Sequence, residues 1–357
     1  MKNKTIFLFS LFLIFTFISC ATTNNTEKIP SENKELKRVM KTEYAGYDEM
    51  VERGFDLHEL DYISSKEEFA EVYLKYYYDE NGYPLDNHIY IPDIPSYRTS
   101  TTTVFYNEYG NKEELKAKGY KENETMFYFP SNGEKDWRVG RIGLGIGHET
   151  QVPKKSSIYD YYETKKSIYY RLPSFAGQMG DIPFIKGTKE KENIIFDLRS
   201  NGGGHMTWAN NFFKKLGKYD GKILILYDNC SASAAECFFF IAKCNPNQVY
   251  GLPNNQINFT ITNYNITLIG TNTAGCAKYG FEGMDGQPCD FYFKKLGLEL
   301  YLPDAKALER ITKHDYDYGK DFQEGRGLLP DAWAVTDEQY IKTIQLYTGD
   351  YELNHLL

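Results

Sequence analysis

A regular alternation of strand-like and helix-like segments in the second half of the chain restricts its fold more than any other feature. Short apolar runs such as IIFDL, KILILYD and NITLIG are separated by MTWANNFFKKLG and SAAECFFFIAKC, which have helical spacing. Apolar strands that alternate with helices are typical of a parallel sheet covered on both faces. We therefore predict an α/β fold with a βαβαβ unit of parallel strands at its centre.

Small and polar residues follow each of these three apolar runs. The first run is followed by RSNGGG, the second by NCSAS and the third by TNTAG. The carboxyl ends of parallel strands meet at one edge of a sheet, and ligands of such sheets bind beyond that edge. We therefore expect an active site to lie where these three segments meet.

Ser233 is the candidate nucleophile, because it stands where the second apolar run turns into a helix. The first turn of a helix offers unpaired backbone N–H groups, so the N–H of Ala234 could stabilise an oxyanion. The triple glycine at 202–204 could bring a second N–H close, since glycine permits positive φ and a close approach of backbone. The alternatives are an ordinary helix N-cap by Ser231 or Ser233 and an ordinary tight turn.

The first twenty residues have the pattern of a signal peptide. Lys2 and Lys4 precede an apolar stretch that is short for a membrane span, and FISC follows. This resembles the lipobox of bacterial lipoproteins, although Phe17 stands where that class prefers leucine. The resemblance implies an exported protein of the bacterial cell envelope, anchored to the membrane through lipid on Cys20. The alternative is an ordinary signal peptide with an incidental cysteine.

Composition divides the rest of the chain into segments. Residues 21–34 are polar and predict a flexible tether, and residues 35–88 have helical periodicity with Ser64 or Ser65 as candidate N-cap. Residues 89–166 are rich in tyrosine and β-branched residues and predict a strand-rich insert. Residues 167–357 form the predicted core domain. The insert could gate the access of a substrate or only cover the core.

Charge and the positions of cysteine and histidine argue against other classes of function. The net charge is −8 and no basic block is present, so we expect no nucleic-acid partner. Apart from Cys20, the cysteines are odd in number and force no disulfide. The six histidines lack the spacing of metal ligands, so we expect neither a metal site nor a cofactor.

Three motifs, IIFDLRSNGGG, ILILYDNCSASAAE and LIGTNTAG, together resemble the catalytic core of the C-terminal processing, or tail-specific, serine peptidases. The likeness covers about residues 167–335 and implies a crotonase/ClpP-like α/β core. It implies a serine endopeptidase, which cleaves peptide or protein substrates through an acyl-enzyme. On this resemblance Ser233 is the nucleophile, and Gly203 and Ala234 supply the oxyanion donors. No segment resembles the PDZ domain typical of the processing branch.

The general base is where the sequence departs from that branch. The processing peptidases have a lysine directly after the T-x-G of the third motif, whereas this chain has Cys276 there. The tricorn-like branch instead uses a histidine from the N-terminal region, which His88 in YPLDNHIYIP matches. The same resemblance implies Glu324, in EGRGLLPDAW, as the group that orients the histidine. Asn87 occupies the relay position, where that branch has a serine.

Several alternatives stay open from the sequence alone. Three other side chains are candidate bases: Lys278, His205 and His148. The nucleophile could be a cysteine, Cys230 or Cys276, and Glu236 is expected to hold the loop of Ser233. The chain could also be a catalytically inactive relative that binds peptides or lipids, because the lysine and the relay serine are both replaced.

Overall fold

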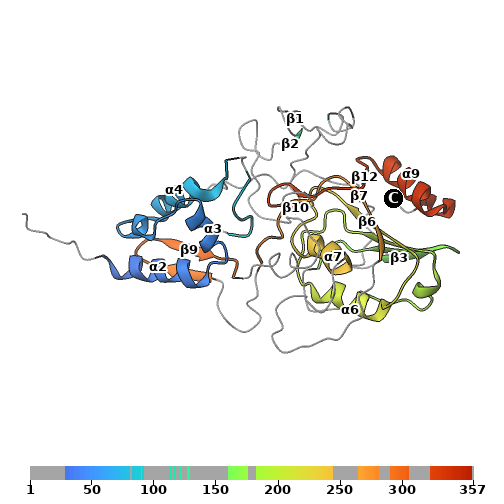
Figure 1. Ribbon diagram of the computed structural model, residues 1–357, viewed down its shortest axis with the longest axis horizontal. Coiled ribbons are helices and arrows are strands. Elements are labelled where there is room, and N and C mark those ends of the chain that lie inside the picture. The colour runs from blue at the N-terminus through green and yellow to red at the C-terminus, as the bar shows by residue number, and fades with distance from the viewer. Residues whose placement is uncertain are drawn as a thin grey trace, which may run out of the picture.

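The computed structural model contains a six-stranded sheet (Figure 1). It describes residues 29–80, 83–89, 91, 160–175, 182–243, 264–280, 290–304 and 322–355, with a few residues between 113 and 128. The strand order is β12-β7-β6-β5-β4-β3. The strands are β3 (Asp160–Glu163), β4 (Ser167–Arg171), β5 (Asn193–Asp197), β6 (Lys222–Tyr227), β7 (Asn265–Gly270) and β12 (Ala332–Trp333). All neighbours pair in parallel except β3, which is antiparallel to β4.

Helices cover both faces of this sheet, which explains why the middle of its central strands β5 and β6 is apolar on both faces. Helices α6 (Thr207–Leu216) and α7 (Ala234–Lys243) lie on one face, and α9 (Asp337–Thr348) with the 3-10 helix η4 (Tyr351–His355) lies on the other. Successive residues of β5 alternate between them: Ile194 and Phe196 pack on the first face, and Ile195 packs on the second. Burial of each such side chain contributes about 1.5–3 kcal/mol to stability.

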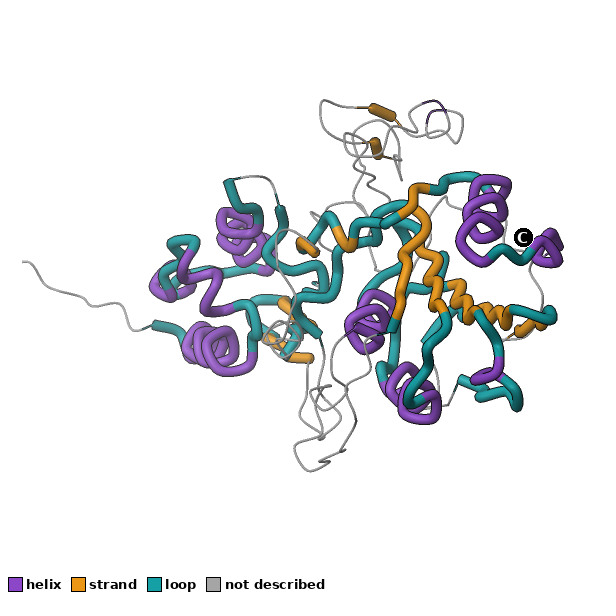
Figure 2. The backbone as a smooth tube through the Cα atoms, turned by 45° about the vertical axis from the view of Figure 1, so that its right-hand side comes forward, coloured by secondary structure: helices purple, strands orange, loops and turns teal. Residues whose placement is uncertain are grey.

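A second, mostly helical unit precedes the sheet in the chain. It contains α2 (Ser31–Glu43), α3 (Tyr47–Glu52), the 3-10 helix η1 (Leu57–Leu60) and α4 (Lys66–Tyr77). Helix α4 begins at Lys66 because the side chain of Ser65 accepts a hydrogen bond from the N–H of Glu68. Figure 2 shows these helices at one end of the molecule and the six-stranded sheet at the other.

A hairpin from late in the chain completes the N-terminal unit. Strands β8 (Asp290–Phe293) and β9 (Leu298–Tyr301) pair antiparallel, and their apolar side chains join the core of α2, α3 and α4. The N–H of Ala45 donates to the carbonyl of Pro303 at 2.9 Å and fixes the hairpin to the helices. The unit is therefore built from two segments that lie far apart in the sequence.

The predicted mixed α/β fold with a parallel sheet is confirmed, and the finer crotonase/ClpP-like assignment stays a prediction. Strand β3, which the sequence places in the insert, is the edge strand of the central sheet. The β8–β9 hairpin, placed in the core domain, packs in the N-terminal unit. The domain boundaries themselves stay a prediction.

The other described elements are short. They are η2 (Thr188–Glu190) and two strand pairs, β1 (Lys121–Glu122) with β2 (Phe127–Tyr128) and β10 (Phe322–Gln323) with β11 (Gly327–Leu328). The signal segment, Cys20 and most of the predicted insert lie outside the described residues. Within the described part of the chain, no helix combines the length and the apolar character needed to cross a bilayer.

Candidate active site

Three loops at the carboxyl ends of β5, β6 and β7 come together in the structure. The N–H of Ala232 donates to the carbonyl of Asn201 at 2.9 Å, which joins the loop after β6 to the loop after β5. The N–H of Ala274 donates to the carbonyl of Ser231 at 2.9 Å and joins the loop after β6 to the loop after β7. The segments RSNGGG, NCSAS and TNTAG therefore meet at one edge of the sheet, as parallel strands dictate.

Ser233 forms a strained turn directly before α7. Its φ is 54°, in the left-handed region that residues other than glycine seldom adopt. Such a conformation costs on the order of 1–3 kcal/mol and persists only where the surroundings enforce it. Its neighbours Ala232 and Ala234 are buried, whereas Ser233 is only half-buried. The turn therefore leaves the serine more exposed than either neighbour at the start of the helix.

Glu236 enforces this turn from the first turn of α7. Its buried carboxylate accepts four hydrogen bonds, from the N–H of Ser233 (3.0 Å), the hydroxyl of Thr273 (2.5 Å), the N–H of Gly275 (2.8 Å) and the N–H of Cys276 (2.8 Å). Burial raises the pKa of Glu236 to about 7, and the four donors act in the opposite direction. The expectation that Glu236 holds the loop of Ser233 agrees with these contacts.

Gly203 lies against the backbone of the candidate nucleophile. Its φ is +98°, and a Cβ added there would lie 2.7 Å from the Cβ of Ser233 and 2.9 Å from the N of Ala234. No other residue fits that space without displacing the turn. The N–H of Gly203 donates to Oδ1 of Asn201 at 2.9 Å, so it reaches an oxyanion only by leaving or sharing that acceptor. The N–H of Ala234 is the first of helix α7 and needs no such change.

His88 comes from the N-terminal unit and meets Ser233 across the two parts of the molecule. Its Nε2 lies 3.1 Å from Oγ of Ser233, and its Nδ1 lies 3.3 Å from Sγ of Cys276. Its own N–H donates to Asp86 Oδ1 at 2.6 Å, which fixes the backbone. The imidazole is buried apart from 7% of the residue surface. Sγ of Cys276 also lies 3.6 Å from Nε2, so the hydroxyl contacts one ring nitrogen and the thiol lies near both.

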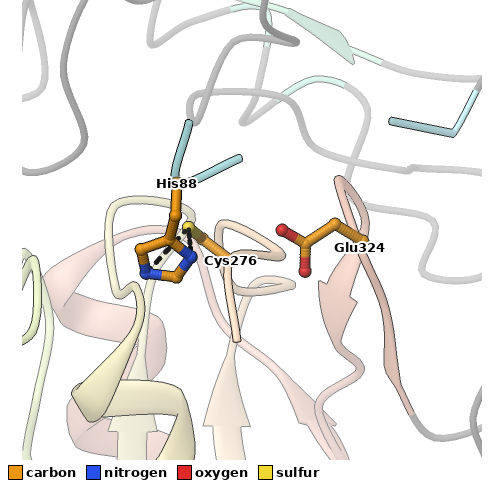
Figure 3. A group of neighbouring side chains, drawn as sticks. All are labelled: His88, Cys276 and Glu324. Carbon is orange, nitrogen blue, oxygen red and sulfur yellow. Dashed lines mark hydrogen bonds between the residues drawn. The ribbon is translucent and has the colours of Figure 1, made fainter. Parts of the chain in front are cut away.

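Glu324 is fully buried. It lies near His88 and Cys276 (Figure 3). Its carboxylate accepts from the N–H of Asn87 at 3.0 Å and from the N–H of Lys278 at 3.1 Å. It therefore ties the segment of His88 to the loop after β7 through main-chain groups. Burial raises its pKa well above the ordinary range, and the charges of Asp86 and Glu236 raise it further.

The side chain of Asn87, which occupies the predicted relay position, bonds to a main-chain carbonyl and to a tyrosine hydroxyl. Its side-chain amide donates to the carbonyl of Gly275 at 2.8 Å, and its Oδ1 accepts from the hydroxyl of Tyr77 at 2.9 Å. The side chain therefore fixes the loop that carries His88 to both parts of the molecule.

The alternative bases lie in other settings. Nζ of Lys278 forms an ion pair with Glu49 of α3, which also accepts from the hydroxyl of Tyr279 at 2.6 Å. The N–H of His205 donates to the carbonyl of Phe175, and within the described residues its ring makes no hydrogen bond to Ser233. His148 lies outside the described residues.

The two candidate cysteine nucleophiles are both buried. Cys276 is fully buried, and Cys230 is 6% exposed with a pKa that burial raises well above the ordinary thiol value. A thiol in such a setting is a poor nucleophile, because the thiolate is the reactive form. The contact between Cys276 and His88 was missed by sequence reasoning, since the two residues lie far apart in the chain and no local spacing links them.

No family model matches the chain, and no curated protein matches it in sequence. A candidate peptidase from Parabacteroides merdae ATCC 43184 is 15% identical with a TM-score of 0.37, over 87% of this chain and 91% of that one. A lipoprotein from Streptococcus agalactiae is 14% identical with a TM-score of 0.37, over 90% and 97% of the two chains. A photosystem II D1 C-terminal processing protease is 14% identical with a TM-score of 0.29, over 54% and 48%.

Proposed function

We propose that the protein is a serine endopeptidase that hydrolyses peptide or protein substrates. The observation that carries this proposal is the 3.1 Å contact between Oγ of Ser233 and Nε2 of His88, made at a strained turn that begins a helix. An imidazole beside a half-buried hydroxyl suits the removal of a proton at neutral pH. The first N–H of a helix suits the negative charge that then forms on an attacked carbonyl.

The reaction begins when Nε2 of His88 accepts the hydroxyl proton of Ser233 as Oγ attacks the carbonyl carbon of a peptide bond. The oxyanion is stabilised by the N–H of Ala234, and by Gly203 once its N–H turns from Asn201. His88 then donates the proton to the leaving amine, and the C–N bond breaks to leave an acyl-enzyme. Water, deprotonated by His88, hydrolyses the ester and restores Ser233.

His88 is oriented in this proposal from three sides. Asp86 fixes its backbone, Glu324 fixes the preceding N–H, and the thiol of Cys276 lies at Nδ1. Glu324 is therefore proposed to orient the imidazole through the chain rather than by direct proton transfer. No metal or cofactor takes part in these steps.

Hydrolysis of an unfolded protein substrate tests this function. Ser233→Ala is expected to lower the rate of cleavage by at least a thousandfold, because the acyl-enzyme cannot form. Ser64→Ala is the control, since it removes an exposed hydroxyl of the N-terminal unit and leaves the loop of Ser233 unchanged. Equal cleavage by wild type and Ser233→Ala would show that another residue, or another protein in the preparation, performs the reaction.

The second candidate is a catalytically inactive module that binds peptides. The contact of the Gly203 N–H with Asn201 favours it, because an oxyanion donor is already occupied. A folded wild type that binds unfolded peptides and cleaves none of them would support the module and overturn the peptidase.

We also propose that the protein is exported and anchored to a bacterial membrane through lipid on Cys20. The FISC motif after a short apolar stretch supports this. Cys20→Ala is expected to remove the incorporation of labelled fatty acid and to release the protein from the membrane fraction. Cys230→Ser is the control and retains both properties. A wild type without label would contradict the anchor.

A further inference from the structure

Three metal-ligating side chains from separate parts of the chain lie together in the structure. They are His88, Cys276 and Glu324, all buried, and one potential ligand atom of each lies within 4.8 Å of the others (Figure 3). His88 comes from the N-terminal unit, Cys276 from the loop after β7, and Glu324 from the turn between β10 and β11. An imidazole, a thiol and a carboxyl supply one nitrogen, one sulfur and one oxygen donor.

The spacing of these donors is close to that of a zinc site. Tetrahedral Zn²⁺ binds nitrogen, oxygen and sulfur at about 2.0–2.3 Å, so neighbouring donor atoms are about 3.5 Å apart. Sγ of Cys276 lies 3.3 Å from Nδ1 of His88 and 3.6 Å from Nε2, so the thiol side chain must rotate to share a metal with the Nδ1 lone pair. A carboxylate oxygen of Glu324 lies within 4.8 Å of the other two donors, so it must move closer to complete a three-ligand set. A fourth position is left for water, as in open zinc sites.

The charges around the group favour a cation. Two further acidic side chains lie against the group, because Asp86 accepts from the N–H of His88 at 2.6 Å and Glu236 accepts from the N–H of Cys276 at 2.8 Å. A buried thiolate and a buried carboxylate are each unfavourable unless an opposite charge accompanies them. A divalent cation bound between them would offset the repulsion among these acidic groups.

We propose that His88, Cys276 and Glu324 form an inhibitory site for Zn²⁺ or a chemically similar divalent transition-metal ion. This inference rests on the proposed function of Ser233 and His88. On binding, Cys276 releases its thiol proton to solvent, and Nδ1 of His88 donates its lone pair to the metal. The remaining ring proton is then fixed on Nε2.

A metal on Nδ1 would stop the reaction without blocking access to Ser233. Nε2 must accept the proton of Ser233 during attack, and a protonated Nε2 can only donate a hydrogen bond to Oγ. The 3.1 Å contact would persist with its direction reversed. Removal of the metal frees Nδ1, allows the proton to return there, and restores the base.

Metal binding is measured first, with Co²⁺ as a spectroscopic substitute for zinc and with the full-length chain under reducing conditions. One equivalent of Co²⁺ is expected to give a thiolate-to-cobalt charge-transfer band in the near ultraviolet, which excess Zn²⁺ removes. Cys276→Ser should lose the band and Cys230→Ser should retain it, because Cys230 belongs to the nearby nucleophile loop and not to the group. Equal bands in both variants would overturn the site.

Inhibition is measured separately, by the rate at which a fluorophosphonate labels Ser233. Zn²⁺ is expected to slow labelling of the wild type at least tenfold, and a chelator should restore it. Whatever rate Cys276→Ser retains should change less than twofold with Zn²⁺. A wild type that binds cobalt through Cys276 yet labels equally fast with Zn²⁺ would overturn the inhibitory role.

The two proposals fail in different ways. If the wild type is not labelled at all, the peptidase proposal fails, and with it the inhibitory role, while the cobalt band still decides whether the metal site exists. Ser233→Ala should bind Co²⁺ like the wild type, since the hydroxyl is not one of the three ligands. Loss of the cobalt band in that variant would contradict the assigned ligand set.

Discussion

At the scale of single residues, the backbone turn at the candidate nucleophile depends on neighbouring residues that no similar residue can replace. Ser233 keeps a φ of 54° because Glu236 holds its N–H and Gly203 leaves room for its Cβ. These residues come from the loop after β5 and from α7, so the turn is specified by contacts and not by its own sequence. Gly203 of the first motif is explained by the same contact.

Gly203→Ala is predicted to disable the site while leaving the fold intact. An added methyl group would lie within 3 Å of the backbone around Ser233, at a φ of +98° that strains any side chain. We expect a loss of fluorophosphonate labelling of at least a hundredfold. Gly297→Ala is the control, because its φ is also positive at +58° and nothing lies within 4 Å. Equal labelling of the two variants would contradict the packing described for Gly203.

Asp197 at the end of β5 predicts how stability depends on pH. It is fully buried, and its carboxylate bonds to Arg199 at 2.7 Å and to the hydroxyl of Tyr169 at 2.5 Å. Burial acts to raise its pKa, but Arg199 and Arg171 outweigh burial and lower the pKa to about 2. The unfolded value is about 3.9, so the stabilisation is complete above that pH and is lost as pH falls toward 2.

This carboxylate should account for about 2 kcal/mol of the acid sensitivity of the fold. The free energy of unfolding of Asp197→Asn, measured by urea at several pH values, should fall less steeply between pH 4 and 2 than that of the wild type. At neutral pH the variant should be less stable by about 3–5 kcal/mol, because Arg199 stays buried without its partner. Asp220→Asn, whose side chain is 84% exposed, should match the wild type throughout.

At the scale of elements, the central strands and helices could be predicted because each apolar run is buried on both faces of the sheet. Strands β5, β6 and β7 and helices α6 and α7 follow that pattern, and Ser65 caps α4 as predicted. The sequence predicted that the N-terminal region is helical. It did not predict the breaks at Gly46 and Gly54, where the chain turns between helices. Residue patterns also could not place β8 and β9, since a hairpin's partner depends on contacts across the chain.

The β8–β9 hairpin is predicted to be an integral part of the N-terminal core. Leu298 is fully buried in the cluster that it shares with α2 and α4. Leu298→Ala should lower the free energy of unfolding by about 2–5 kcal/mol, as expected for a large core side chain replaced by alanine. Leu346→Ala on α9 is the control, because Leu346 is 80% exposed. Equal stability of the two variants would show that the hairpin does not pack there.

At the scale of the whole molecule, the candidate site exists only where the two parts of the chain meet. His88 belongs to the N-terminal unit and Ser233 to the sheet, and they are separated by 145 positions in the chain. The residues at the strand ends predicted that Ser233 belongs to the site. His88 was predicted only because YPLDNHIYIP resembles a family pattern. The group of His88, Cys276 and Glu324 had no sequence signal, since metal-site patterns depend on short spacings.

The ion pair of Lys278 with Glu49 also joins the N-terminal unit to the part of the chain that carries the sheet. It gives a test of whether Lys278 or His88 is the general base. Because Nζ of Lys278 is bound to α3, we predict that Lys278→Met keeps its labelling rate within about threefold of the wild type. His88→Ala should lower that rate at least a hundredfold, the usual contribution of a general base. The reverse order would transfer the role of base to the lysine.

The central claim is that Ser233 is an activated hydroxyl, and covalent labelling followed by peptide mapping tests it most directly. The full-length protein is treated with a fluorophosphonate, digested, and analysed by mass spectrometry. We expect one adduct per chain, located on Ser233, with none in Ser233→Ala and an undiminished yield in Ser64→Ala, whose side chain is exposed. A folded wild type that carries no adduct, or that carries it on another residue, would contradict the claim.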